Sequence, residues 1–411
     1  MKTNFMTILA KAAASICIPA SLLLYGYFSP VKNNTKKSEQ IPGHSSINID
    51  KQTSQESNKP FSAQPKIQAA ILLDVSNSMD GLIDQAKAQL WNMVSVMGKA
   101  KCNESVPQIE IALYEYGRTT NDKNQGYVKQ ISPFTNDLDQ LSQSLFNLKT
   151  NGGDEFCGHV IYSSVNELKW DTSFANYKVI FIAGNEDFLQ GDITFTKACT
   201  AAKEKGVIVN TIYCGDKMYG IREHWNLAGE CGNGSYTNIN ADAQLDDIET
   251  PYDSLLFSLN DSLNQTYISY GYSGNAKMLM QAEMDKKNAK FNKSAGLARV
   301  SVKSKKGLYN NSTWDLIDAD TKDKNFIDQI DLKTLPDSIK FKSREEVKKI
   351  VRTKSTERNK IQKEISEITL KRDQFITNEK VKNSTNKTPT LETEIEKIIR
   401  QQAKKFHMTI E

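Results

Sequence analysis

Histidine is scarce in this sequence, with four residues in 411. No Cys-x-x-Cys pair and no cysteine–histidine cluster at zinc-ligand spacing occurs, so a structural zinc module is excluded. A phosphate-binding glycine loop, a dinucleotide fingerprint and a nucleophile elbow are also missing, which removes the common signatures of nucleotide-binding proteins and α/β hydrolases. A Ser/His/Asp site would have only His159 and His224 in the folded core, and neither has an obvious partner.

A strong net charge is missing too. The formal charge is +4, from 53 basic and 49 acidic side chains, which argues against nucleic-acid binding. The two signs are distributed unevenly, because residues 336–411 carry 19 basic and 12 acidic side chains, against 34 and 37 elsewhere. The simplest interpretation of this basic tail is a solvated helical surface, and the alternative is a contact with an anionic membrane or partner.

The N-terminus contains the longest uncharged apolar run, residues 12–29, which follows Lys2 and Lys11. A basic start followed by such a run predicts an export signal. The run is just long enough to span a bilayer, and the bulky Tyr27-Phe28 leaves no small-residue cleavage site. We therefore expect residues 1–30 to be an uncleaved membrane anchor in the cell envelope, followed by a polar linker over 31–65. The alternative is a cleaved signal peptide, which would leave a periplasmic or secreted protein.

Five of the six cysteines follow the apolar run: Cys102, Cys157, Cys199, Cys214 and Cys231. Export would allow disulfides, but an odd number leaves at least one thiol free. Two bridges among five cysteines can form in fifteen ways, and the sequence does not choose between them. We interpret Cys157 and the nearby His159 as structural residues.

Buried strands alternate with amphipathic helices between residues 66 and 267. This alternation predicts an α/β fold with a doubly wound, mostly parallel sheet, in which ligands bind at the carboxyl ends of the strands. The expected strands cover 68–74, 109–116, 127–131, 178–183, 207–213 and 235–239, with the third at an edge. The expected helices cover 81–97, 138–148, 160–170, 194–205 and 246–268.

The pentapeptide Asp74-Val75-Ser76-Asn77-Ser78 falls where the first strand ends and the first helix begins. One carboxylate and two hydroxyls at alternate positions can point into a common space, and such hard oxygen ligands suit Mg²⁺. A helix N-cap or a hydrogen-bonded turn without metal explains the same residues.

In this context the motif resembles the metal-ion-dependent adhesion site (MIDAS) of von Willebrand factor A-type domains. The resemblance covers about residues 66–267, and Met79 follows the motif as in many members of the family. It implies that Asp74 reaches the metal through water, that Ser76 and Ser78 ligate directly, and that a partner's carboxylate takes the open position. The chain is also similar to a group of exported bacterial A-domain proteins whose function is not settled.

Two later loops depart from the family pattern. The threonine expected in the second loop falls near Glu155, with Asp154 beside it, and the aspartate expected in the third loop falls at Gly184. The predicted ligands of a weakly held Mg²⁺ or Mn²⁺ are therefore Asp74, Ser76, Ser78, Asp154 and Glu155. The predicted partner contacts are Asn185, Glu186 and Asp187.

The second half is predicted to be helical. Residues 268–335 read as a mixed, mainly helical connector in which Trp314 is a packing anchor. Residues 336–411 read as a basic helical hairpin with a short coiled coil. The apolar stripe at Ile361, Ile365, Ile368 and Phe375 would form its seam, with possible self-association through residues 343–376.

These observations favour an exported, non-enzymatic binding protein that recognises a protein partner at the strand ends, with help from a divalent metal. The competing hypothesis is an envelope scaffold that oligomerises through the coiled coil. A metal-dependent hydrolase with Asp154 or Glu155 as general base is a third, weaker hypothesis, because no nucleophile or second ligand set supports it.

Overall fold

The computed structural model describes residues 64–102, 105–242, 247–382 and 390–410. The predicted anchor, almost all of the predicted linker and Cys17 lie outside these residues. Across the described ranges, no helix is both long and apolar enough to cross a membrane.

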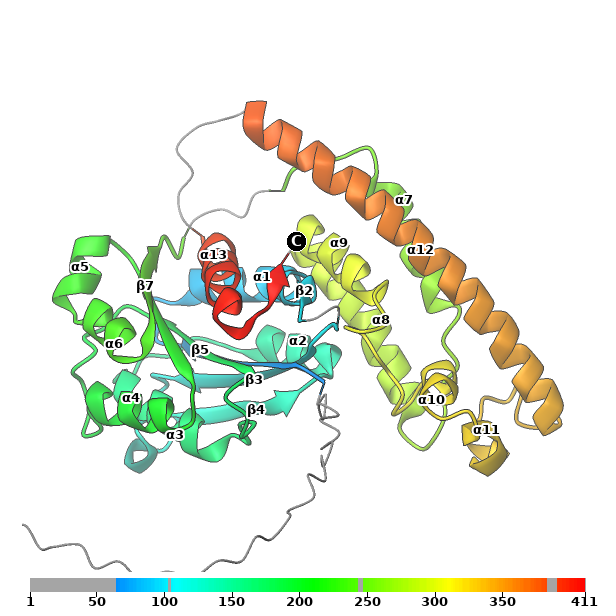
Figure 1. The fold of residues 1–411 in the computed structure, drawn as a ribbon, viewed down its shortest axis with the longest axis horizontal. Coiled ribbons are helices and arrows are strands. Elements are labelled where there is room, and N and C mark those ends of the chain that lie inside the picture. Colours follow the sequence, from blue (N-terminus) through cyan, green and yellow to red (C-terminus); the bar gives the residue numbers. More distant parts are fainter. Residues whose placement is uncertain (1–63, 103–104, 243–246, 383–389, 411) are drawn as a thin grey trace, which may run out of the picture. The chain divides into compact units, whose positions relative to one another are not determined.

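Six strands form the main sheet, in the order β4-β3-β1-β5-β6-β7 (Figure 1). All neighbours are parallel except β3 and β4, so the predicted doubly wound, mostly parallel sheet with an edge strand is confirmed. A separate antiparallel pair joins β2 to β8. The strands are β1 (Lys66–Asp74), β2 (Ala100–Lys101), β3 (Gln108–Tyr116), β4 (Lys129–Thr135), β5 (Tyr177–Gly184), β6 (Ile208–Cys214), β7 (Asn233–Ile239) and β8 (Thr409–Ile410).

The helices fall into two groups. Those within the predicted A-type domain are α1 (Asp80–Met97), α2 (Leu138–Asn147), α3 (Cys157–Glu167), α4 (Phe195–Glu204), α5 (Lys217–Arg222), α6 (Trp225–Cys231) and α7 (Asp253–Asn264). Those that follow it are α8 (Gly274–Phe291), α9 (Lys293–Lys303), α10 (Leu316–Lys322), α11 (Phe326–Gln329), α12 (Arg344–Lys382) and α13 (Leu391–Ala403). The short helices α5 and α6 and the strands β2 and β8 were not expected from the sequence.

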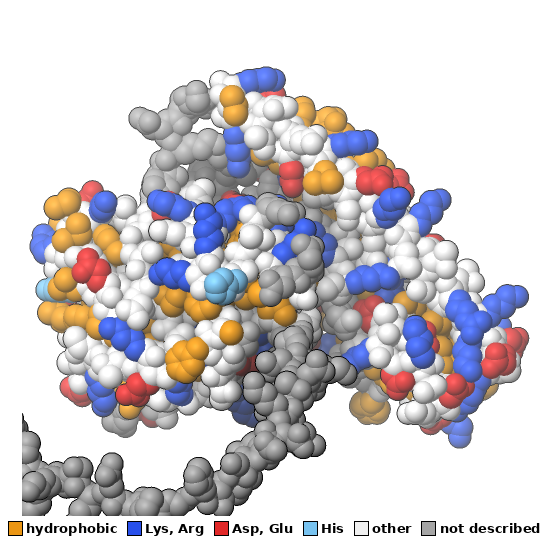
Figure 2. Space-filling model, viewed as in Figure 1, with side chains coloured by type: hydrophobic (Ala, Val, Ile, Leu, Met, Phe, Trp, Pro, Cys, Tyr) orange, Lys and Arg blue, Asp and Glu red, His pale blue; other side chains and the backbone are white. Residues whose placement is uncertain are grey.

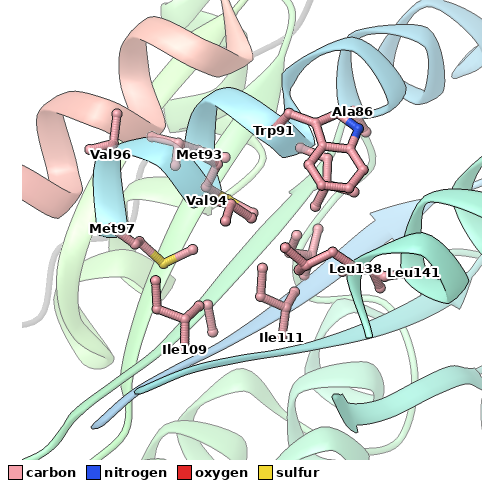
Figure 3. Close-up of a cluster of buried hydrophobic side chains, with 14 of the residues drawn as sticks. Ala86, Trp91, Met93, Val94, Val96, Met97, Ile109, Ile111, Leu138 and Leu141 are labelled. Atoms are coloured by element: carbon pink, nitrogen blue, oxygen red, sulfur yellow. The ribbon is translucent and has the colours of Figure 1, made fainter. Parts of the chain in front are cut away.

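The two faces of the sheet are covered by different helices, because side chains alternate along each strand. On β1, Ile71 and Leu73 join a core with α1, α2 and α13, whereas Ala70 and Leu72 join a core with α3, α4 and α6. Figure 3 shows the first core, in which α1 lies over the strands and Leu138 and Leu141 of α2 lie beside Ile111.

The C-terminal helices pack differently from the predicted hairpin. Helix α12 packs mainly along α7, with further contacts to α9, α10 and α11, while α13 packs mainly on α1 and reaches β7. The predicted seam residues Ile361 and Ile365 are buried in the core that includes α7 and α9. Ile361 and Ile365 are thus buried within the chain, whereas Ile368 and Phe375 are partly exposed. Because α12 and α13 pack mainly on different helices, the antiparallel hairpin is wrong.

Helices α8 and α9 join the sheet domain to the rest of the chain. The link is a buried ionic network around Arg299 of α9, which is fully buried and forms ion pairs with Asp139 of α2 and Asp285 of α8. The Arg299 guanidinium also lies over the ring of Trp91 of α1, 4.6 Å from its centroid. Lys303 donates to Asp285 at 2.8 Å. All of the described residues belong to one compact unit. Trp314, 4% exposed beside Tyr267, is a packing residue as predicted.

Replacing Ile365 by lysine should destabilise the whole described unit, because this side chain is fully buried. Losing its burial costs about 1.5–3 kcal/mol, to which the desolvation of an ammonium group is added. Leu370→Lys on the same helix is the matched control, since Leu370 is 63% exposed. Denaturant unfolding should show a lower midpoint for Ile365→Lys only, and equal midpoints would contradict the packing of α12.

Replacing Arg299 by methionine should lower the free energy of unfolding by about 3–5 kcal/mol, because Asp139 would remain buried without its cation. Lys287→Met on α8 is the control, since its ion pair with Glu283 is partly exposed and such pairs contribute at most about 1 kcal/mol. Urea titration of both variants measures the difference. Similar losses would show that the Arg299 network does not hold the helices to the sheet.

Candidate functional site

The motif Asp74–Ser78 forms a turn at the carboxyl end of β1, between the ends of β3 and β5. Asp74 pairs in register with Tyr116 on β3, and Leu73 pairs with Ala183 on β5, so Gly184 lies beside Asp74. The backbone N–H of Ser76 donates to Asp74 Oδ1 at 2.7 Å. The N-cap of α1 is Met79, and no side chain caps it. The N-cap interpretation of the motif is therefore wrong, whereas the hydrogen bond from Ser76 to Asp74 Oδ1 is that of a turn.

Asp74 is fully buried, and its second carboxylate oxygen, Oδ2, has no hydrogen-bond partner. Burial raises the pKa of Asp74 to about 6, against the opposing effect of the hydrogen bonds from Ser76. A buried carboxylate oxygen without a donor is costly, and a cation would relieve that cost.

Glu155 is the residue of the second loop that approaches this turn. It is 6% exposed, and the Ser76 side chain lies close enough to favour its ionised form. A Cβ atom at Gly117 would lie 2.9 Å from Glu155 Cγ and 3.0 Å from Asp74 Oδ1, so both side chains pack against the same glycine. Burial, then the charges of Asp74 and Glu186, raise the pKa of Glu155 to about 8. Asp154, in contrast, is exposed.

The third loop contributes Asn185 rather than an aspartate. A Cβ atom at Gly184 would lie 2.4 Å from the Tyr116 hydroxyl and 3.0 Å from Asp74 Cβ, so a side chain has no room there. Tyr116 is the residue that sequence reasoning missed, since its hydroxyl fills this space and donates to the carbonyl of Ala183 at 3.0 Å. No signal in the sequence marks it as more than a strand residue.

The predicted partner-contact residues divide between two roles. The side-chain amide of Asn185 donates to Ser78 Oγ at 3.4 Å, so Asn185 borders the motif. Glu186 is exposed, and its negative charge raises the pKa of both Asp74 and Glu155. Asp187 pairs with His224 Nδ1 at 3.0 Å and thereby ties the loop to the start of α6.

The structure therefore brings together Asp74, Ser76 and Glu155, with Ser78 and Asn185 beside them. Within the described ranges, no group of three His, Cys, Asp or Glu side chains could by itself hold a metal ion. An ion here would depend on two carboxylates, two hydroxyls and water. The oxygen-only donors and the unpaired Asp74 Oδ2 fit a weakly held Mg²⁺ or Mn²⁺.

No protein-family model and no curated protein matches this sequence. Solved structures do match over parts of the chain. An aerotolerance-related membrane protein from Bacteroides fragilis, with multiple mutations to serine, is 14% identical, with 43% of this chain and 93% of that chain covered and a TM-score of 0.31. The VWA domain of SpRpn10 is 18% identical, with 44% of this chain and 91% of that chain covered and a TM-score of 0.32.

Proximal thread matrix protein 1 from the mussel byssus, with a zinc-occupied MIDAS motif, is 11% identical, with 43% of this chain and 42% of that chain covered and a TM-score of 0.33. Similarities at this level carry no argument about function. The chain has a von Willebrand factor A-like fold, and this assignment depends on the strand order and connections of its own sheet.

The two raised pKa values predict how the stability of the metal-free protein depends on pH. Between the unfolded and folded pKa values the native state binds more protons, so stability should fall as the pH rises from about 4 to about 8. Above about pH 6, the raised pKa of Glu155 should lower the free energy of unfolding of wild type by at most about 1.4 kcal/mol per pH unit. Glu155→Gln should remove this decrease. Urea unfolding at pH 5, 6, 7 and 8 in chelator measures it. If the unfolding free energies of wild type and Glu155→Gln change with pH in parallel, the pKa of Glu155 is not raised in the folded protein.

Proposed function

We propose that this chain is a non-enzymatic, exported binding protein that recognises a protein partner at the carboxyl-terminal edge of its sheet. The observation that carries the proposal is an exposed apolar patch beside the candidate site. Its residues, here called the α5–α6 patch, are Leu189, Met218, Tyr219, Ile221 and Leu227.

The α5–α6 patch consists of five large apolar side chains that are exposed to solvent. Its side chains are 37–68% exposed, and they come from two short neighbouring helices and the loop after β5. Figure 2 shows hydrophobic side chains gathered over α5 and α6. Large exposed apolar groups that cluster in this way are typical of interaction surfaces. Tyrosine and methionine are also enriched at the centres of protein–protein interfaces.

Hydrogen bonds connect the patch to the candidate site. Trp225, at the start of α6, donates its indole N–H to the carbonyl of Glu186 at 2.7 Å. The backbone N–H of Phe188 donates to the carbonyl of Glu223 at 3.0 Å. The loop that borders Ser78 through Asn185 is therefore attached to the helices that carry the patch. A partner that covers the patch would lie beside the Asp74–Ser78 turn.

The metal belongs to the same proposal. Asp74, Ser76, Ser78 and Glu155 would hold Mg²⁺ or Mn²⁺, and the ion would neutralise the two buried carboxylates. In the family that the motif resembles, the open position of the metal takes a partner's carboxylate. Ser78 is exposed, which leaves that side of the turn accessible to a partner.

The scaffold hypothesis receives less support. Its basis was an apolar stripe on residues 343–376, and Val347, Val351, Ile361 and Ile365 of that stripe are at most 8% exposed within one chain. Association between copies through this stripe would depend on its partly exposed residues Ile368 and Phe375.

Affinity capture from an envelope extract tests the proposal. A protein captured by wild type should be lost with Met218→Ser/Tyr219→Ser and should be reduced by chelator. Phe341→Ser is the control, since Phe341 is 85% exposed on a distant segment of the chain. Retention of the same proteins by the patch variant would contradict the proposed surface. If wild type still captures the partner in chelator but the patch variant does not, the surface is supported and the metal has no role in binding.

Millimolar Mg²⁺ or Mn²⁺ should raise the thermal midpoint of the protein, because an ion that binds only the folded state stabilises it. The expected gain is about 1.4 kcal/mol at ten times the dissociation constant. Asp74→Ala and Glu155→Gln should remove the increment, whereas Asp154→Asn should keep it, because Glu155 is the loop carboxylate that packs against Gly117 beside Asp74. Thermal melts with and without chelator measure this. An unchanged midpoint in wild type, with no heat of binding, would establish the motif as a hydrogen-bonded turn.

A further inference from the structure

Two of the five described cysteines lie on α4 and α6, which pack against each other. Cys199 lies on α4 and is fully buried, and Cys231 is the last residue of α6 and is partly exposed. Burial and, after it, the nearby Cys231 thiol raise the pKa of the Cys199 thiol. It also lies 3.7 Å from the carbonyl oxygen of Ala228, one helical turn before Cys231 on the same face of α6.

The other described cysteines are placed differently. The Cys157 thiol lies 3.8 Å from the hydroxyl of Tyr116, behind the candidate site. Cys214 is buried at the end of β6, and Cys102 lies next to β2. Of the fifteen pairings that the sequence leaves open, the contact between α4 and α6 singles out one bridge.

We propose that Cys199 and Cys231 form a disulfide when the folded protein meets an oxidising thiol–disulfide couple, such as that of an exported compartment. The inference is independent of partner binding. Both thiols are free in the structure, which corresponds to the reduced form.

Glutathione disulfide can oxidise the two thiols in two successive exchange steps. The more exposed Cys231 loses its proton and attacks one sulfur of glutathione disulfide, which forms a mixed disulfide and releases one glutathione thiolate. Cys199 then loses its proton and attacks the sulfur of Cys231, which forms the Cys199–Cys231 bond and releases the second glutathione. The two cysteines are oxidised, and glutathione disulfide accepts the electron pair and the two protons.

The bridge would fix the support of the candidate site. Helix α6 starts at Trp225, which holds the carbonyl of Glu186, and follows His224, which holds Asp187. A covalent link from the end of α6 to α4 would therefore help to anchor the third loop, which is attached to the start of α6. It would also close a chain loop of about thirty residues and stabilise the folded state by restricting the unfolded chain.

Peptide mapping tests the proposal directly. The full chain, purified under reducing conditions, is equilibrated with a glutathione/glutathione disulfide buffer, alkylated and digested without reduction. We expect a cross-linked peptide pair that joins Cys199 to Cys231 in most molecules, with Cys102, Cys157 and Cys214 alkylated after unfolding. Full alkylation of Cys199 and Cys231, or a bridge from either one to a different cysteine, would overturn the proposal.

Thermal melting supplies a second readout. The oxidised wild type should melt roughly 5 °C or more above the reduced protein. Cys231→Ser should melt at the same temperature in both buffers, whereas Cys102→Ser should keep the difference. A redox-dependent shift that survives Cys231→Ser, or no shift in wild type, would contradict the bridge.

Discussion

The described unit depends on the ionic network around Arg299. A guanidinium on α9 with no exposed surface is satisfied by carboxylates from α2 and α8, by the carbonyl of Gln281 and by the face of Trp91 on α1. Lys303 continues the network to Asn260 and Asn264 of α7. Because buried charges need well-oriented partners, the network permits few alternative arrangements of these five helices. A second buried arginine, Arg358 on α12, repeats this arrangement with Asp315 and Asp318.

The candidate site has the opposite electrostatic character. Elsewhere in the described residues, buried carboxylates such as Asp139 and Asp315 face arginine. Asp74 and Glu155 face each other and Glu186 instead, and burial raises the pKa of both. The fold thus accepts two uncompensated acids at the strand ends. Such local violations of the rule followed by the rest of a protein are typical of functional sites.

The sheet could be predicted from the sequence because buried parallel strands give continuous apolar runs, as in residues 68–74 and 178–183. The place of Asp74 and Ser76 followed from those strands, since a motif after the first strand must lie at the sheet edge. The choice of Glu155 over Asp154 could not be predicted, because it depends on how the loop folds against Gly117. Charged residues in helices read as surface, so nothing marked Arg299, Lys303 or Arg358 as buried. An amphipathic stripe shows that a helix packs but not on what, which is why the partners of α12 and α13 differ from those expected.

The helix α13 and the strand β8 come from the last described residues of the chain, yet they complete the first core. Leu391, Ile395 and Ile399 pack among side chains of α1 and the sheet, and β8 pairs with β2 directly after α1. During synthesis, the sheet and α1 would emerge from the ribosome before α13, so part of this core would still be uncovered. Only after α13 has been made can that part be covered. Premature termination between α12 and α13 would therefore leave apolar side chains of this core exposed to solvent. Such chains are prone to aggregate and are bound by chaperones.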